Sequence, residues 1–227
     1  MQFIIAQSKK NVEAWKAHLL HSENQDEGRI DIQKSLGNNS MLLVLDWAMK
    51  FVPRKFLENQ ADWFRKRGIS WHISVTIRQS QSKSLEMLTL VHLFQKSNKD
   101  SNYVLAIIDD VTHQLKCAMS ELNCVNLRQD NAWCDHCALT ILGVRQLAVK
   151  HNVAVRMDFS DPQDSKGPCN RKVANIKNHM RSHLNSGHDI CNAAEMRSAI
   201  VANGGLQGVS VIHCEPVEAS NLDLLPK

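Results

Sequence analysis

The chain has 227 residues, of which 43% are hydrophobic and 22% charged, a composition typical of a folded globular protein. Its net charge of +4 is too small to define a polyanion-binding protein by itself. The apolar run in the opening MQFIIAQSKK is too short for a secretory signal, and no segment has the length of a membrane span. We therefore expect an intracellular protein without a membrane partner.

The predicted elements begin with a helix over residues 8–21, which the polar segment SENQDEG ends. Three strands follow, and the first is apolar enough to be buried on both faces. Helices and strands then alternate, with Ser101 as the expected cap of the first of these helices. The strands are expected at residues 41–47, 68–78, 85–95, 123–130, 153–159 and 208–214, and the later helices at 101–119, 138–152, 170–187 and 192–205.

This order predicts an α/β fold, with a mixed sheet built in the order β-β-β-α-β-α-β-α and helices on both of its faces. We expect an N-terminal helical extension over residues 1–40 and a core over residues 41–187. A C-terminal helix, strand and tail complete the chain over residues 188–227.

Two carboxylates follow predicted strands directly. Asp46 ends the strand MLLVLDW and Asp130 ends the strand NCVNLRQD. Ligands gather at the carboxyl ends of strands in an open α/β sheet, and paired carboxylates there suit Mg²⁺ or Mn²⁺. Each residue taken alone also fits a turn or a helix cap. The pair predicts a metal site only if the first and fourth strands are neighbours.

Three segments resemble those around the acidic positions of the ribonuclease-H-like transposase and integrase superfamily, and most closely those of transposon-derived animal proteins. They read LVLDWAMKF, LRQDNAWCDH and DFSDPQDSKGPCNRKVANIK. The resemblance implies a ribonuclease-H-like fold for metal-dependent cleavage or strand transfer on DNA, with Asp46 and Asp130 as the first two Mg²⁺ or Mn²⁺ ligands. It also implies a nuclear location, and it leaves a homo-oligomer open.

The third acidic position departs from this pattern. The residue three positions after Gly167 is Asn170. An amide offers one neutral oxygen and no charge, so both cation affinity and stabilisation of developing negative charge should fall. Asp161 and Asp164 lie in the preceding loop and are the remaining candidates for a third acid. The chain is therefore expected to be weakened or inactive as a transposase or nuclease.

The segment that carries Asn170 is also basic. No Asp or Glu occurs from Ser165 to His188, and Lys177 and Arg181 fall on the same helical face as Asn170. Cations there could hold backbone phosphates in a salt-sensitive manner, although a solvated helix face is the ordinary explanation. The candidate nucleic-acid-binding residues are Lys166, Arg171, Lys172, Lys177 and Arg181.

Two alternatives stay open. The first is a non-enzymatic DNA-binding or protein-interaction module that keeps the fold. The second is a zinc-stabilised regulatory module, suggested by Cys134 with Cys137 and by His179 with His183. The long spacer between these two pairs is unlike that of a compact zinc finger, so we do not expect zinc.

Overall fold

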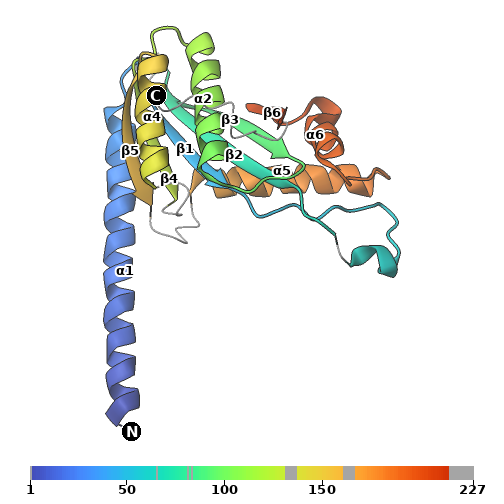
Figure 1. Cartoon of the computed structure of the whole chain (residues 1–227), viewed down its shortest axis with the longest axis horizontal. Coiled ribbons are helices and arrows are strands. Elements are labelled where there is room, and N and C mark those ends of the chain that lie inside the picture. The colour runs from blue at the N-terminus through green and yellow to red at the C-terminus, as the bar shows by residue number, and fades with distance from the viewer. Residues whose placement is uncertain are drawn as a thin grey trace.

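The computed structural model describes residues 2–64, 66–80, 82, 84–130, 137–160 and 167–214, and for residues 2 and 130 it describes the backbone alone. A six-stranded mixed sheet in the order β5-β4-β1-β2-β3-β6 forms the centre of the molecule (Figure 1).

Three antiparallel strands form the middle of this sheet. They are β1 (Ser40–Trp47), β2 (Ser70–Gln79) and β3 (Leu85–Phe94). Their apolar and β-branched runs suit strands that are covered on both sides. Leu42 and Leu43, which are neighbours on β1 and face opposite sides of the sheet, are both fully buried. The predicted meander is therefore confirmed.

The remaining strands run parallel to their neighbours. β4 (Cys124–Asp130) pairs with β1, β5 (Ala154–Ser160) pairs with β4, and β6 (Val209–Cys214) pairs with β3. A parallel pair needs a crossover connection, and helices supply the crossovers into β4 and β5. These are α2 (Ser101–Ala118) and α4 (Ala138–Lys150).

Asp100 is the cap of α2. Its side chain accepts hydrogen bonds from the backbone N–H groups of Asn102 and Tyr103. The prediction that Ser101 caps this helix is wrong by one residue, because an ionised carboxylate there meets two free N–H groups and the positive end of the helix dipole.

Helices cover both faces of the sheet and define two hydrophobic cores. α2 and α4 lie on one face, while α5 (Pro168–Asn185) and α6 (Ala193–Val201), followed by the short turn η2 (Ala202–Gly204), lie on the other. Gly143 allows α4 to approach α2 closely, since a Cβ atom there would lie 2.6 Å from both methyl groups of the fully buried Leu105.

The helix α1 (Gln2–Ser35) is much longer than the predicted helix over residues 8–21. SENQDEG does not end it, because the segment contains no proline and its one glycine costs only about 1 kcal/mol. A salt bridge at 2.9 Å joins Asp26, within the segment, to Arg29, just after it, and spans one helical turn.

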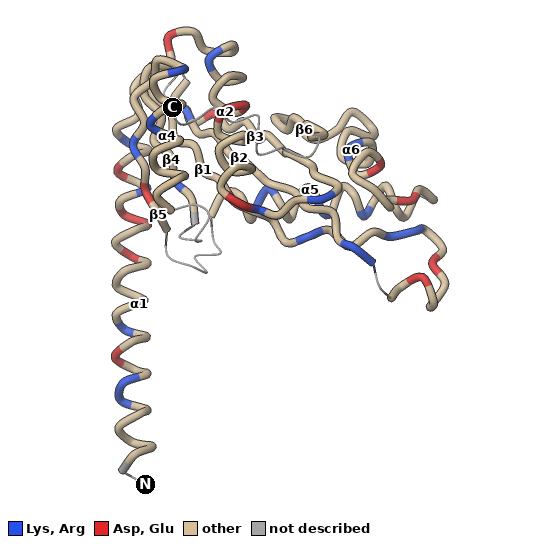
Figure 2. Tube along the Cα trace, in the orientation of Figure 1, with Lys and Arg blue, Asp and Glu red and all other residues tan. Residues whose placement is uncertain are grey.

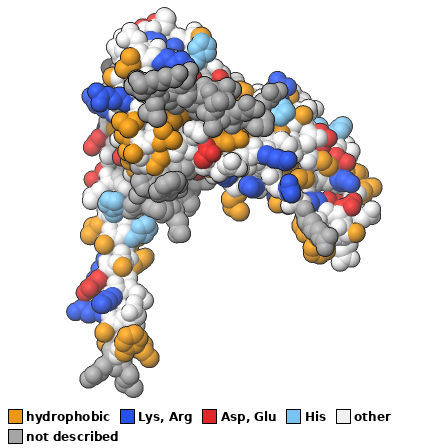
Figure 3. All heavy atoms as spheres, in the orientation of Figure 1, with side chains coloured by type: hydrophobic (Ala, Val, Ile, Leu, Met, Phe, Trp, Pro, Cys, Tyr) orange, Lys and Arg blue, Asp and Glu red, His pale blue; other side chains and the backbone are white. Residues whose placement is uncertain are grey.

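The C-terminal part of α1 contacts the sheet. Ile32 packs against the core, and Arg128 of β4 donates a hydrogen bond to the backbone oxygen of Gln25. The N-terminal half projects from the body, with charged residues along it (Figure 2) and apolar side chains at its free end (Figure 3). Trp15 and Leu20 are 60% and 68% exposed.

The segment between β1 and β2 extends away from the sheet and contains the short helix η1 (Gln60–Trp63). Two isolated backbone bridges fix its base. Phe51 pairs with Ile69, and Arg54 pairs with Ile190 in the connection between α5 and α6. The base of the segment is therefore attached both to β2 and to the helical layer.

The order and directions of β3-β2-β1-β4-β5, with helical crossovers into β4 and β5, form a ribonuclease-H-like sheet that β6 extends by one strand. The predicted fold class is confirmed.

The division of the chain into parts at residues 40 and 187 stays a prediction. Among the described residues, no helix combines the length and hydrophobicity needed to cross a membrane.

A buried leucine of the sheet and an exposed leucine of α1 should respond differently to truncation. Leu42→Ala should lower the free energy of unfolding by about 2 to 5 kcal/mol, because it leaves a cavity in a closed core. Leu20→Ala on α1 should change it by no more than about 0.5 kcal/mol. Urea unfolding followed by fluorescence compares them, and equal losses would contradict this description of α1.

Candidate metal centre and nucleic-acid interface

The first candidate site lies where β1 and β4 end. The parallel register pairs Leu45 with Gln129, so the next positions, Asp46 and Asp130, lie side by side on neighbouring strands. β5 ends at the same edge of the sheet, because Asp130 of β4 pairs with Ser160 of β5. The structure therefore brings these two sequence positions together, which the prediction of a metal site required.

The start of α5 adjoins the same edge. Gly167 precedes the helix, Pro168 opens it, and the buried Cys169 donates from Sγ to the backbone oxygen of Val44 at 3.4 Å. Burial raises the pKa of the Cys169 thiol, and the negative charge of Asp46 raises it further. The first turn of α5 therefore lies beside Asp46.

Asn170 follows Cys169 in this turn and is exposed. An exposed polar residue at this point is not required by the packing of α5, whose apolar side faces the sheet. The structure thus places the third position of the resemblance near the first, on the solvent side of the helix.

Several candidates lie outside the described residues. These are Asp161, Asp164 and Lys166, together with the side chain of Asp130. Among the residues that are described, no three His, Cys, Asp or Glu side chains are grouped closely enough to hold a metal ion.

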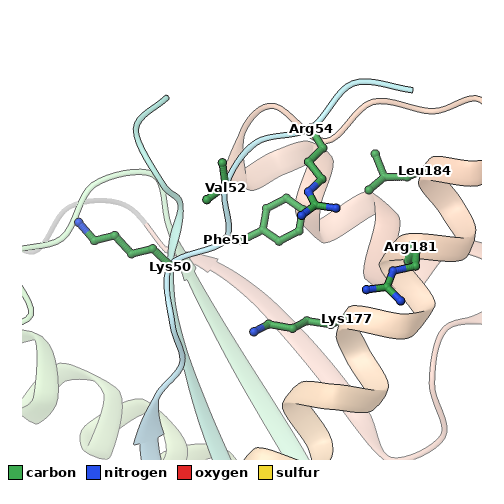
Figure 4. Close-up of a pocket in the computed structure, with 7 residues that line it drawn as sticks. All are labelled: Lys50, Phe51, Val52, Arg54, Lys177, Arg181 and Leu184. Atoms are coloured by element: carbon green, nitrogen blue, oxygen red, sulfur yellow. The ribbon is translucent and has the colours of Figure 1, made fainter. Parts of the chain in front are cut away.

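The basic residues of α5 separate into different surroundings. Lys172 is half-buried and borders a cavity near the start of β1, whereas Arg171 is exposed. Lys177 and Arg181 instead border one cavity together with Lys50 and Arg54 (Figure 4). Lys50 and Arg54 are far from α5 in the sequence, and no local pattern indicated that these residues would meet Lys177 and Arg181.

Cys137 and the histidine pair lie on opposite faces of the sheet. Cys137 begins α4 and lies 3.0 Å from Ser101 Oγ of α2, on the face of the sheet covered by these two helices. His179 and His183 belong to α5 on the opposite face. Cys134 lies outside the described residues. A site that joins Cys137 to the two histidines is therefore excluded by the sheet between them.

A row of side chains on the α2 face, in which His72 and His92 are buried, escaped the sequence analysis. Trp47, His72 and His92 are cross-strand partners on β1, β2 and β3, and His92 Nε2 lies 2.9 Å from Asp110 Oδ2 of α2. Burial lowers the pKa of His72 well below its usual value, and His92 and Lys99 act in the same direction. The alternation of side chains along β2 could have predicted the burial of His72. It places His72 on the other face of the sheet from the apolar Trp71 and Ile73, in a strand expected to be covered on both faces.

No protein-family model matches the chain, and no curated protein matches it significantly. Solved structures similar to it include a pre-cleavage Mos1 transpososome, with 14% identity and a TM-score of 0.33 over 61% of this chain and 42% of that one. The Mn-soaked, inhibitor-bound nuclease domain of human cytomegalovirus terminase gives 9% identity and a TM-score of 0.35 over 85% and 73%.

A paired-end complex of Mos1 transposase with the left transposon end gives 12% identity and a TM-score of 0.35 over 81% of this chain and 59% of that one. The chain thus spans less than two thirds of the Mos1 chains it resembles. TM-scores this low do not establish a shared fold, so the fold assignment depends on the strand order and directions.

The buried His72 should make stability sensitive to acid. Below pH about 6.5 the unfolded chain binds a proton at this residue that the folded chain does not, so the free energy of unfolding should fall as the pH is lowered. The contribution reaches at most about 1.4 kcal/mol per pH unit. Urea unfolding between pH 7.5 and 5 measures it.

The matched comparison is between a buried and an exposed histidine. His72→Gln should give a shallower pH dependence than the unsubstituted chain, whereas His213→Gln, on the exposed side of β6, should leave it unchanged. The same slope in all three proteins would show that His72 does not resist protonation.

Proposed function

We propose that the chain is a nucleic-acid-binding protein with a ribonuclease-H-like core, in which metal-dependent cleavage or strand transfer is weakened or lost at the third acidic position. The observation that carries this proposal is the parallel pairing of β1 and β4. It brings Asp46 and Asp130 to adjacent strand ends, next to the turn of α5 that contains Asn170.

Asp46 and Asp130 are the residues that would hold a divalent cation. Carboxylate oxygens are the ligands that Mg²⁺ and Mn²⁺ prefer. The fit is supported by the parallel register of β1 and β4, which puts these two positions at adjacent strand ends. When bound, such an ion supplies Lewis acidity toward a phosphodiester oxygen.

Asn170 explains why this chemistry would be weak. An acid at this position would add one negative charge and two strong acceptors toward a second ion, whereas the amide adds one neutral acceptor. Because Asn170 is exposed, its substitution for an acid costs the core nothing. Asp161 and Asp164 are the remaining sources of a third carboxylate, and their Asn variants test whether either one serves.

Nucleic-acid binding can persist without cleavage. Lys177 and Arg181 border a cavity at the edge of the contact between α5 and the core, so their charges are available to phosphate independently of any metal ion. This observation favours a binding protein that keeps the fold as the second candidate function. We expect DNA as the partner and the nucleus as the location, both from the resemblance of the sequence.

Restoring the missing acid is the decisive experiment. Asn170→Asp should raise Mn²⁺-dependent nicking of a supercoiled plasmid by about 10- to 100-fold, because it restores a carboxylate ligand for a second metal ion. Asp46→Asn combined with Asn170→Asp should return nicking to background.

DNA binding measured on the same proteins is the control for folding and for surface charge. Unchanged nicking in Asn170→Asp, with DNA binding and stability intact, would contradict a centre that lacks only its third acid. That result would favour the second candidate function, a nucleic-acid-binding protein without cleavage activity.

A further inference from the structure

A cavity with a volume of about 190 Å³ lies between α5 and the segment that follows β1. Phe51, Val52 and Leu184 supply its apolar lining. Figure 4 shows Arg54, Lys177 and Arg181 pointing into the space between the helix and the segment, while the ammonium group of Lys50 points away from it. We call Arg54, Lys177 and Arg181 the pocket cations.

Backbone hydrogen bonds hold the wall of this cavity that the segment between β1 and β2 forms. Phe51 and Ile69 exchange backbone hydrogen bonds of 3.0 and 2.8 Å, and Arg54 and Ile190 exchange two of 2.8 Å. Trp71 Nε1, from the fully buried ring, donates to the backbone oxygen of Met49 at 2.7 Å. The backbone that carries Arg54 is thus fixed on both sides, so ligand binding need not order it.

The helical wall is equally fixed. Ile176 and Met180, which alternate with the cations along α5, are 0% and 1% exposed. The backbone positions of Lys177 and Arg181 are therefore set by the core rather than by solvent.

Among the described residues, no counter-charge is found for the pocket cations. No carboxylate is among the described residues that line the cavity, and within the described part of the chain none of the three forms an ion pair. Arg54 lies over the ring of Trp63 at 5.8 Å. Lys150, by contrast, pairs with Asp109 at 2.7 Å. Like charges around one cavity repel each other, and a bound anion relieves that repulsion.

We propose that this cavity binds a backbone phosphate of a nucleic-acid strand, with the pocket cations on the phosphate oxygens and the apolar lining against the sugar. The inference rests on the proposed function and assigns it a specific anchoring point. Arginine suits this ligand, because its planar fork donates two hydrogen bonds to one phosphate.

The position of the pocket along α5 sets a spacing. Lys177 lies seven residues after Asn170, which corresponds to about 10 Å along the helix axis. B-DNA advances about 3.4 Å per nucleotide of one strand, so the anchored phosphate would be about three nucleotides from the candidate metal centre. The pocket would therefore hold the strand at a fixed distance from Asp46.

Fluorescence anisotropy with labelled single-stranded and duplex DNA tests the proposal on the full chain. Lys177→Gln, Arg181→Gln and Arg54→Gln should each weaken binding about tenfold at low salt and lower the slope of log affinity against log salt by about one. Lys50→Gln removes the same charge from the same cavity lining, but its ammonium group points away, so a smaller loss is expected. Lys16→Gln, on the projecting part of α1, should have no effect.

The outcomes separate the pocket from the broader function. If the unsubstituted chain binds DNA and all five variants bind equally well, the pocket is refuted while nucleic-acid binding stands. If the chain binds no nucleic acid, the proposed function fails, and inorganic pyrophosphate tests the pocket by itself. A rise in melting temperature with pyrophosphate that Lys177→Gln/Arg181→Gln abolishes supports a phosphate site, and no rise overturns it.

Discussion

The parallel pairing of β1 with β4 is the constraint on which the rest of the structure depends. β1 is covered on both faces, so its backbone groups must find their partners in β2 on one side and β4 on the other. A parallel partner must enter from the same end of the sheet, which requires the α2 crossover. The carboxyl ends of β1, β4 and β5 are thereby brought to one edge, and α5 starts at that edge because Cys169 packs on β1.

α5 combines two properties that can change independently. One side of the helix contributes Val173, Ile176 and Met180 to the core, and this side fixes where every other residue of the helix lies. Asn170, Lys177 and Arg181 are outside that contact, so an acid can be lost from the first turn without disturbing the fold or the cations two turns later. Under the proposed function, this separation would allow cleavage to be lost while binding to a polyanion is kept.

The strands were predictable because their apolar and β-branched runs are local, and Asp46 and Asp130 could be assigned to strand ends for the same reason. Their adjacency followed only from the order of elements. The length of α1 was not predictable, since a polar segment is compatible with both a loop and a solvated helix. The meeting of Arg54 with Lys177 depends on the backbone bridge from Arg54 to Ile190, a contact between distant parts of the chain that no periodicity encodes. The buried His72 was missed because histidine is equally common on surfaces.

The projecting half of α1 should unfold locally more often than the rest of the chain. Helices that make no tertiary contacts are marginal in water, and their turns open without waiting for the rest of the molecule. Amide protons between residues 3 and 17 should therefore exchange with solvent far sooner than those of β1, and proteases that need an extended backbone should find their first cleavage points there. Trimming this half would leave the sheet and both of its helical layers whole.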